Sequence, residues 1–165
     1  MQLFSPQLLA LAGSVINAAR GKKLRLVTAE SCTGGLLSGC LTEISGASDV
    51  FDRGFVVYSN DAKMAHLKVF SKTIAGFGAV SAETALEMAK GALSVSGADI
   101  AISVTGIAGP GGGSVEKPAG LVYIGIAAGG KSHALRNLFD GDRTAVRLKT
   151  VEAALFMLKE EIENL

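Results

Sequence analysis

Apolar side chains recur every three or four residues in the first stretch of the chain. They are Leu8, Leu9, Leu11, Ala12, Val15, Ile16 and Ala19, and this spacing places them on one face of a helix. Ser5 followed by Pro6 supplies an N-cap with proline at the first helical position. The pattern therefore predicts a helix over about residues 5–20.

Short runs of apolar and β-branched residues follow at intervals, a composition that favours strands. The runs are residues 24–29, 51–58, 100–105, 120–128 and 131–139. The last two runs are joined by Gly129-Gly130, which is typical of a β-hairpin. We therefore expect five strands, of which the last two are antiparallel.

Helical patterns separate these strands and close the chain. We expect one helix to begin at Thr33, two to cover about residues 61–68 and 82–96, and one to cover residues 142–163. Ser59 or Asn60 can cap the second of these helices, and Ser81 the third. Strands that alternate with helices imply a largely parallel sheet covered on both faces, and the hairpin adds an antiparallel strand. The expected fold is α/β, a three-layer α/β/α sandwich with a mixed, mostly parallel sheet, in one domain over residues 1–165.

Composition and charge narrow the range of functions. The 165 residues are 48% hydrophobic and 19% charged, which indicates a folded globular domain. Sixteen Lys and Arg against fifteen Asp and Glu give a net charge of +1. No run of like charges is present, so we expect no nucleic-acid partner and no membrane-surface partner.

Cysteine usage and hydropathy bear on the compartment. Cys32 and Cys40 lie eight residues apart in one predicted helical segment, which separates them by about 12 Å and rules out a disulfide in that state. No apolar run approaches the ~20 residues that span a bilayer. The expectation is a cytoplasmic protein with reduced thiols.

The first predicted strand gives way to a helix through a hydroxyl-bearing segment with two glycines. The segment reads Thr28-Ala29-Glu30-Ser31-Cys32-Thr33-Gly34-Gly35. Free backbone N–H groups at such a junction can bind a phosphate or stabilise an oxyanion, and the glycines admit a ligand to the backbone. The alternative is that Ser31 or Thr33 only caps the helix, although Glu30 beside them is unusual for a simple cap.

A glycine-rich segment follows the strand at 100–105. Residues 105–113 contain five glycines, and a backbone this bare suits close approach, positive φ angles or an anion-binding nest. In a parallel sheet this loop emerges at the same edge as Ser31. The pattern is neither GxxxxGK[ST] nor a GxGxxG that opens a helix. A flexible surface loop is the competing interpretation.

A serine nucleophile needs a base, and the two histidines, His66 and His133, are in no recognisable triad context. Lys63 or Tyr58 is the better candidate, since both follow the strand at 51–58. A lysine base requires its pKa to fall by several units through burial or a neighbouring cation. Cys32 is a rival nucleophile, because a thiol is intrinsically more reactive at pH 7.

Two arginines begin the last predicted helix. Arg143 and Arg147 follow Asp140-Gly-Asp142, and their guanidinium groups suit phosphate or carboxylate. A salt bridge to Asp140 or Asp142 is the alternative. No HxxxH, CxxC or complete calcium loop is present, so no metal is expected.

Six ordered motifs together resemble the CinA C-terminal-domain family. The motifs are TAESCTGG (28–35), VVYSNDAK (56–63), GAVSAETA (78–85), TGIAGPGGG (105–113), KPAGLVYIG (117–125) and GDR (141–143). The resemblance runs from about residue 5 to residue 160. It is greatest to the family's stand-alone nicotinamide-nucleotide amidohydrolases.

The resemblance implies hydrolysis of the carboxamide of nicotinamide mononucleotide to nicotinate mononucleotide and ammonia, in pyridine-nucleotide recycling, without cofactor or metal. It assigns catalysis to Ser31, Tyr58 and Lys63. Substrate binding falls on Thr33, Gly34, Gly35, Thr105, Gly106, Ala108, Gly109, Gly111, Gly112, Gly113 and Arg143. The expected partners are the nucleotide substrate and further copies of the chain, most simply in a dimer. The alternative is a non-catalytic nucleotide-binding or regulatory module of the same family.

The mechanism expected from this set is acyl transfer. Ser31 attacks the carboxamide carbon, Lys63 takes its proton with help from Tyr58, and amides within residues 32–35 hold the oxyanion. The hypothesis requires three separate stretches of chain to converge on one pocket.

Overall fold

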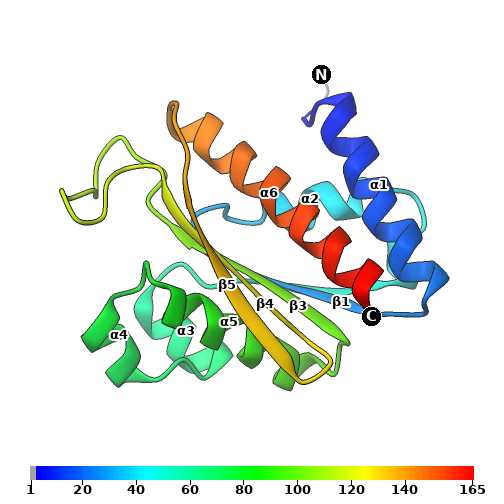
Figure 1. The fold of residues 1–165 in the computed structure, drawn as a ribbon, viewed down its shortest axis with the longest axis horizontal. Helices are drawn as coiled ribbons and strands as arrows, with labels where there is room; N and C mark the ends of the chain where they lie inside the picture. The colour runs from blue at the N-terminus through cyan, green and yellow to red at the C-terminus, as the bar shows by residue number, and fades with distance from the viewer. Residues whose placement is uncertain (1–2) are drawn as a thin grey trace.

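The computed structural model describes residues 3–165 and contains one five-stranded sheet (Figure 1). The strands lie in the order β2-β1-β3-β4-β5. Their bounds are β1 Leu26–Glu30, β2 Phe51–Val56, β3 Ile100–Gly106, β4 Leu121–Ala128 and β5 Lys131–Leu138. All five strands therefore coincide with the predicted apolar runs, with ends that differ by at most two residues.

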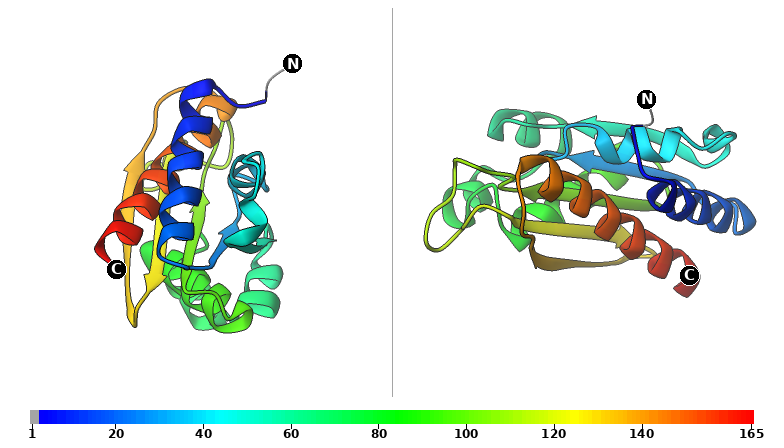
Figure 2. Two further views of the ribbon diagram at one scale, coloured as in Figure 1. Left: turned by 90° about the vertical axis from the view of Figure 1, so that its right-hand side faces the viewer. Right: turned by 90° about the horizontal axis from the view of Figure 1, so that it is seen from above.

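Helices cover both faces of the sheet, which confirms the predicted three layers (Figures 1 and 2). One face carries α1 Pro6–Gly21, α2 Leu36–Thr42 and α6 Arg143–Asn164, and the other carries α3 Asn60–Leu67, α4 Ser71–Phe77 and α5 Ala82–Ser96. Each face has its own apolar core: one contains Ile16, Leu37 and Leu155, and the other contains Leu67 and Met88. No helix within residues 3–165 is both long and apolar enough to cross a membrane.

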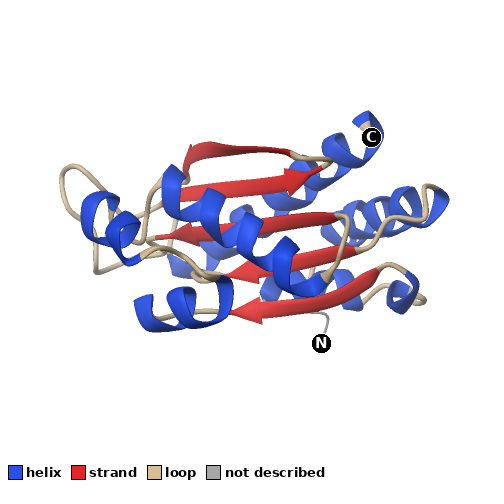
Figure 3. Cartoon of the chain, turned by 90° about the horizontal axis from the view of Figure 1, so that it is seen from below, coloured by secondary structure: helices blue, strands red, loops and turns tan. Residues whose placement is uncertain are grey.

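Strand direction places the carboxyl ends of three strands at one edge of the sheet. β1 pairs in parallel with both β2 and β3, whereas β3–β4 and β4–β5 are antiparallel. The reversed direction of β4 is visible in Figure 3. The loops after β1, β2 and β3 consequently emerge together, as the sequence predicted, and this is where an open α/β sheet binds its ligands.

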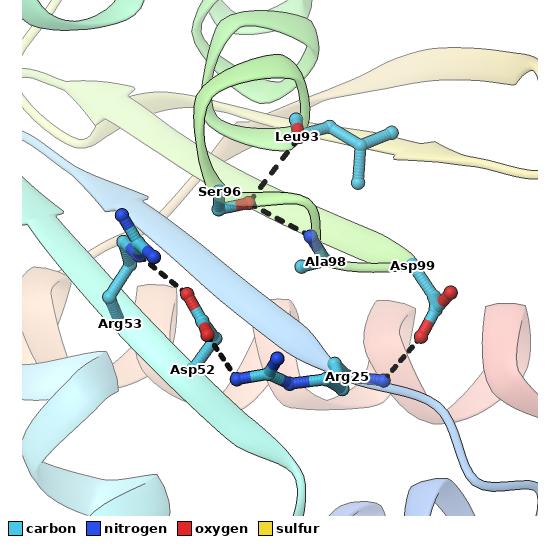
Figure 4. A network of polar contacts seen from close by, with 7 residues as sticks. All are labelled: Arg25, Asp52, Arg53, Leu93, Ser96, Ala98 and Asp99. Atoms are coloured by element: carbon cyan, nitrogen blue, oxygen red, sulfur yellow. Dashed lines mark hydrogen bonds and ion pairs between the residues drawn. The ribbon is translucent and has the colours of Figure 1, made fainter.

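Polar contacts connect the opposite, amino ends of the same three strands (Figure 4). The backbone N–H of Arg25 donates to the carboxylate of Asp99, which lies just before β3, at a distance of 2.7 Å. The carboxylate of Asp52 in β2 pairs with the guanidinium groups of Arg25 and Arg53. These contacts fix the strands relative to one another at the end remote from the Ser31 turn.

The segment between the first strand and α2 differs from its prediction. A helix was expected from Thr33, but residues 32–35 form a turn and α2 begins at Leu36. Gly34 and Gly35 have φ angles of 59° and 99°, in the left-handed region that a helix cannot include. The two glycines therefore delay the helix.

Two short elements were not predicted. They are the 3₁₀ turn Ala47–Asp49 and α4, whose seven residues present only Ile74, Ala75 and Phe77 as apolar side chains. The run predicted as strand 51–58 also stops at Val56, so that Val57 and Tyr58 lie in the loop that leads to α3.

The loop between β3 and β4 projects from the carboxyl-end edge of the sheet (Figures 1 and 2). The side chain of Val115 in this loop is completely exposed. At the start of the loop, Gly106 lies so close to β4 that a Cβ atom there would meet the Cγ2 atom of Val122 at 2.6 Å. This part of the glycine-rich segment is therefore packed, whereas its tip is in solvent.

Candidate active site

Ser31 and Lys63 meet at the carboxyl ends of β1 and β2. Ser31 directly follows β1, and its backbone N–H donates to the carbonyl of Val104 in β3. Lys63 lies in the first turn of α3, which Ser59 caps by accepting from the N–H of Ala62. The Nζ atom of Lys63 is 3.0 Å from the Oγ atom of Ser31. The local structure therefore brings the predicted alcohol and amine into direct contact.

Lys63 is a buried lysine that pairs with no acidic side chain in the described part of the chain. Only 1% of the residue is exposed, and it forms none of the ion pairs found within residues 3–165. Its Nζ atom also donates to the carbonyls of Val57, at 3.0 Å, and Tyr58, at 3.2 Å. Burial lowers the pKa of Lys63 from 10.5 because it disfavours the charged ammonium.

The three contacts of Lys63 define what its neutral form can do. A neutral amine has two N–H groups and one lone pair. If the N–H groups bond the two carbonyls, the lone pair faces Ser31 and can accept its hydroxyl proton. The environment therefore suits a lysine that acts as a base.

Cys32 lies beside Ser31 but has different chemistry. Burial raises the pKa of its thiol to about 11, so the thiol is protonated near neutral pH. The thiolate is the reactive form of cysteine. Of the two nucleophiles that the sequence left open, the environment favours Ser31.

Glu30 holds the turn that carries Ser31. Its carboxylate is completely buried and accepts five hydrogen bonds from the turn and the first residues of α2. The donors are the Thr33 hydroxyl and Gly35 N–H, the N–H groups of Leu37 and Ser38, and the Ser38 hydroxyl. The start of α2 is thus capped by the protein's own carboxylate.

A pocket of about 160 Å³ surrounds the Ser31–Lys63 contact. Its lining residues come from all the loops at this edge: Ser31, Cys32, Tyr58, Lys63, Ala79, Val80, Thr105, Gly106, Ala108 and Arg143. A second hollow of about 280 Å³ adjoins it, and the two share Ala108 and Arg143. The arrangement suits an elongated ligand with one end at Ser31 and the other beyond Arg143.

Arg143 lines both hollows, and Tyr58 lines the one at Ser31. Arg143 donates to the carbonyl of Gly109 at 2.9 Å and to the phenol oxygen of Tyr58 at 3.3 Å. Within residues 3–165 it pairs with neither acidic neighbour, since Asp140 binds Lys149 and Asp142 caps α6. The phenol of Tyr58 thus contacts Arg143, and Lys63 contacts only the backbone of Tyr58.

The remaining predicted residues are distributed between the pocket and its support. Thr105 lines the pocket and holds the neighbouring loop by donating to the carbonyl of Ala79. Gly109 lines the second hollow. Thr33, Gly34 and Gly35 form the turn beneath Ser31, whereas the exposed glycines 111–113 line neither hollow. Within residues 3–165, no cluster of His, Cys, Asp and Glu could hold a metal ion.

Comparison with known proteins supports the motif-based assignment. The model of the CinA C-terminal domain matches residues 8–162. The chain belongs to the CinA C-terminal-domain family. This CinA domain is 50% identical to the competence/damage inducible protein CihA from Agrobacterium tumefaciens, with a TM-score of 0.94 and 99% of each chain covered. A CinA superfamily protein from Escherichia coli is 34% identical, with a TM-score of 0.90 over 97% of this chain and 94% of that one.

The curated relatives are longer than this CinA domain. A protein of Caldicellulosiruptor bescii, provisionally named competence-damage inducible, is 55% identical over 90% of this chain but only 36% of its own length. A CinA-like protein of Kosmotoga olearia is 47% identical over 87% of this chain and 34% of its own. The chain therefore spans about a third of the length of these relatives.

Sequence reasoning missed two contributors to this site. The sequence marks Glu30 only as an unusual neighbour of Ser31, and Arg147 only as a candidate for binding phosphate or carboxylate or for a salt bridge. Arg147 instead donates from Nε to the carbonyl of Cys32, at 3.1 Å, and from Nη2 to the carbonyl of Thr33, at 2.9 Å. Its spacing of four residues from Arg143 was the available signal, since it places both arginines on one helix face.

Proposed function

We propose that this CinA domain hydrolyses the carboxamide of nicotinamide mononucleotide to nicotinate mononucleotide and ammonia. The observation that carries the proposal is the buried hydrogen bond between Lys63 Nζ and Ser31 Oγ. A lysine whose pKa is lowered, aimed at an alcohol inside a pocket, is the arrangement that activates a serine without histidine. The family resemblance supplies the substrate.

The residues act in a two-step acyl transfer. Lys63 accepts the proton of Ser31 as Oγ bonds to the carboxamide carbon. The C–N bond then breaks, and ammonia leaves with the proton that Lys63 returns. Water attacks the resulting ester with Lys63 again as base, which releases the acid and restores Ser31. One amine therefore accounts for every proton transfer in the two steps.

The shape of the site supports a mononucleotide as the substrate. We assign the amide-bearing ring to the pocket at Ser31, and the ribose and phosphate to the second hollow. Arg143, which lines both, offers a guanidinium to the phosphate. The phenol of Tyr58 accepts a hydrogen bond from Arg143, and Tyr58 lines the pocket. Its role therefore includes positioning of the substrate.

An ammonia-release assay on nicotinamide mononucleotide tests the proposal. We expect turnover by the parent and a loss of at least about 1,000-fold in Ser31→Ala and Lys63→Met. Ser48→Ala and Lys90→Met change exposed residues outside both hollows and serve as matched controls. A parent that binds the nucleotide without releasing ammonia would contradict the proposal and favour the non-catalytic module.

A further inference from the structure

The five backbone amides of residues 31–35 are not equivalent. Three are engaged: Ser31 donates to Val104, Gly34 donates to the carbonyl of Ser31, and Gly35 donates to Glu30. The amides of Cys32 and Thr33 donate to no acceptor within residues 3–165, although both residues are buried. Buried N–H groups are nearly always paired, and Cys32 lines the pocket at Ser31, so an acceptor on a bound ligand would complete the hydrogen bonding of this turn.

Arg147 contacts the other side of the peptide units that carry these amides. Its Nε atom donates to the carbonyl of Cys32, and that peptide unit ends in the unpaired N–H of Thr33. Its Nη2 atom donates to the carbonyl of Thr33, whose peptide unit ends in the N–H of Gly34. The N–H of Gly34 donates in turn to the carbonyl of Ser31, and that unit ends in the unpaired N–H of Cys32.

Both unpaired amides therefore terminate hydrogen-bonded chains that begin at one guanidinium. A hydrogen bond accepted by a carbonyl makes the N–H of the same peptide a stronger donor, and a charged donor adds to the effect. Glycine suits position 34 of this turn, because the φ angle there is 59° and a Cβ atom would lie in tight contact, 3.3 Å, with Nη2 of Arg147.

We propose that Arg147 is a positioning residue that orients and polarises the amides of Cys32 and Thr33, which bind the oxyanion formed when Ser31 is acylated. The inference deepens the proposed function and rests on it for the identity of the substrate. The sequence indicated phosphate or carboxylate as the binding partner of Arg147, whereas in this proposal Arg147 binds the turn that carries Ser31. Of the backbone amides of residues 32–35 that the sequence offered as oxyanion donors, the proposal assigns this role to those of Cys32 and Thr33.

The first test measures the acylation of Ser31 by a probe that needs no nucleotide recognition. Phenylmethylsulfonyl fluoride sulfonylates an activated serine, and a sulfonyl oxygen occupies the oxyanion position as fluoride leaves. We expect Arg147→Met to slow labelling by about 10- to 100-fold relative to the parent. Arg136→Met removes an exposed guanidinium on β5 and should label at the parent rate.

The second test is steady-state kinetics on nicotinamide mononucleotide. Arg147→Met should lower kcat by a similar factor and change KM by less than about twofold, because the interaction is gained in the transition state. The pH at which kcat/KM is half-maximal should not move, since Lys63 is untouched. The kcat of Arg147→Lys should lie between that of Arg147→Met and that of the parent, because the lysine ammonium can reach one of the two carbonyls.

The outcomes separate the two proposals. Parent-like labelling and kcat in Arg147→Met would overturn the inference. Equal losses in kcat and in affinity, in parallel with a lower melting temperature, would overturn it in favour of a merely structural role. If the parent is labelled at Ser31 and Arg147→Met is labelled slowly, the inference holds even where nicotinamide mononucleotide is not hydrolysed, and only the proposed function fails.

Discussion

Lys63 is as buried as the leucines of the core, yet every contact of its amine is with an oxygen atom. Two of these oxygens are backbone carbonyls of the loop that precedes α3, and the third belongs to Ser31. Because no carboxylate within residues 3–165 forms an ion pair with this amine, burial dominates and the pKa of Lys63 falls. The burial of this amine therefore makes the stability of the fold depend on pH.

The free energy of unfolding of the parent, compared at each pH with that of Lys63→Met, should rise with pH. Between the lowered folded-state pKa and 10.5, the unfolded chain binds more protons at Lys63 than the folded chain does. The free energy of unfolding then increases with pH, by at most about 1.4 kcal/mol per unit. Below the folded-state pKa the penalty for the buried charge is constant. Urea denaturation of both proteins from pH 7 to 10 measures this, and a pH-independent difference would contradict it.

Replacement of Cys32 should leave catalysis largely intact. Its thiol has a pKa of about 11, so it is uncharged in the working range and reacts slowly. We expect Cys32→Ala to keep ammonia release within about fivefold of the parent. Intact-mass measurement should find little alkylation of Cys32 by iodoacetamide at pH 7.5. Rapid alkylation with loss of activity would instead identify Cys32 as the nucleophile.

At the scale of elements, the junction of β1 and α2 is organised by one carboxylate. Glu30 ends β1 and accepts from donors on both sides of the two left-handed glycines. A helix whose first amides are already bound has none of them to offer a ligand. The ligand-binding capacity of this junction therefore lies before the helix, in the turn.

Glu30→Gln should destabilise the protein. The amide presents an NH₂ group to donors that now bond a carboxylate oxygen, which leaves buried N–H or hydroxyl groups unpaired. We expect the free energy of unfolding to fall by about 2–4 kcal/mol, measured by chemical denaturation. Glu43→Gln, at the exposed far end of α2, is the matched control and should change it by less than about 0.5 kcal/mol. Equal effects would show that Glu30 is not the organising group.

The elements that the sequence predicted are those with a local signal. Ser5, Ser59 and Ser81 each accept a backbone N–H three residues on, as their positions before helical patterns indicated. Gly129-Gly130 joins β4 to β5 in the expected antiparallel hairpin, and Ala128 lies opposite Lys131. Helix α4 has seven residues and no side-chain cap, so it offers neither periodicity nor a starting signal.

The candidate site was predictable to the same extent. Ser31 and Lys63 follow parallel strands and Thr105 lies at the carboxyl end of a third, and strand direction alone brings such residues to one edge. The contacts of Arg147 were not predictable, because its partners lie 114 and 115 positions away and the same spacing fits an arginine in solvent. The contact between the phenol of Tyr58 and Arg143 was not predictable either, because the two residues lie 85 positions apart in the sequence.

At the scale of the whole molecule, the pocket is where otherwise separate parts of the chain meet. Loops from the carboxyl ends of β1, β2 and β3 join the first turn of α6, which crosses the opposite face from α3 and α5 (Figure 1). Arg143 is the contact between α6 and the loop after β2. Occupation of the pocket should consequently stabilise the complete fold.

Nicotinate mononucleotide should raise the melting temperature of the parent. A ligand that binds only the folded state adds about 2.7 kcal/mol at 100 times its Kd. Calorimetry is the suitable measurement, because the chain contains no tryptophan. Arg143→Gln should melt close to the parent without ligand and show a smaller shift with it. A variant with an undiminished shift would exclude Arg143 from phosphate binding.

The exposed tip of the β3–β4 loop has a consequence for engineering. A cut in the backbone at Val115 would leave Ser31 and Lys63 on one polypeptide and Arg143 and Arg147 on the other. The seven residue pairs between β3 and β4, and the packing of α6 on α1, would then act as the recognition surface of two fragments. Neither half could work alone, so this domain lends itself to a reporter that is assembled only when its pieces are brought together.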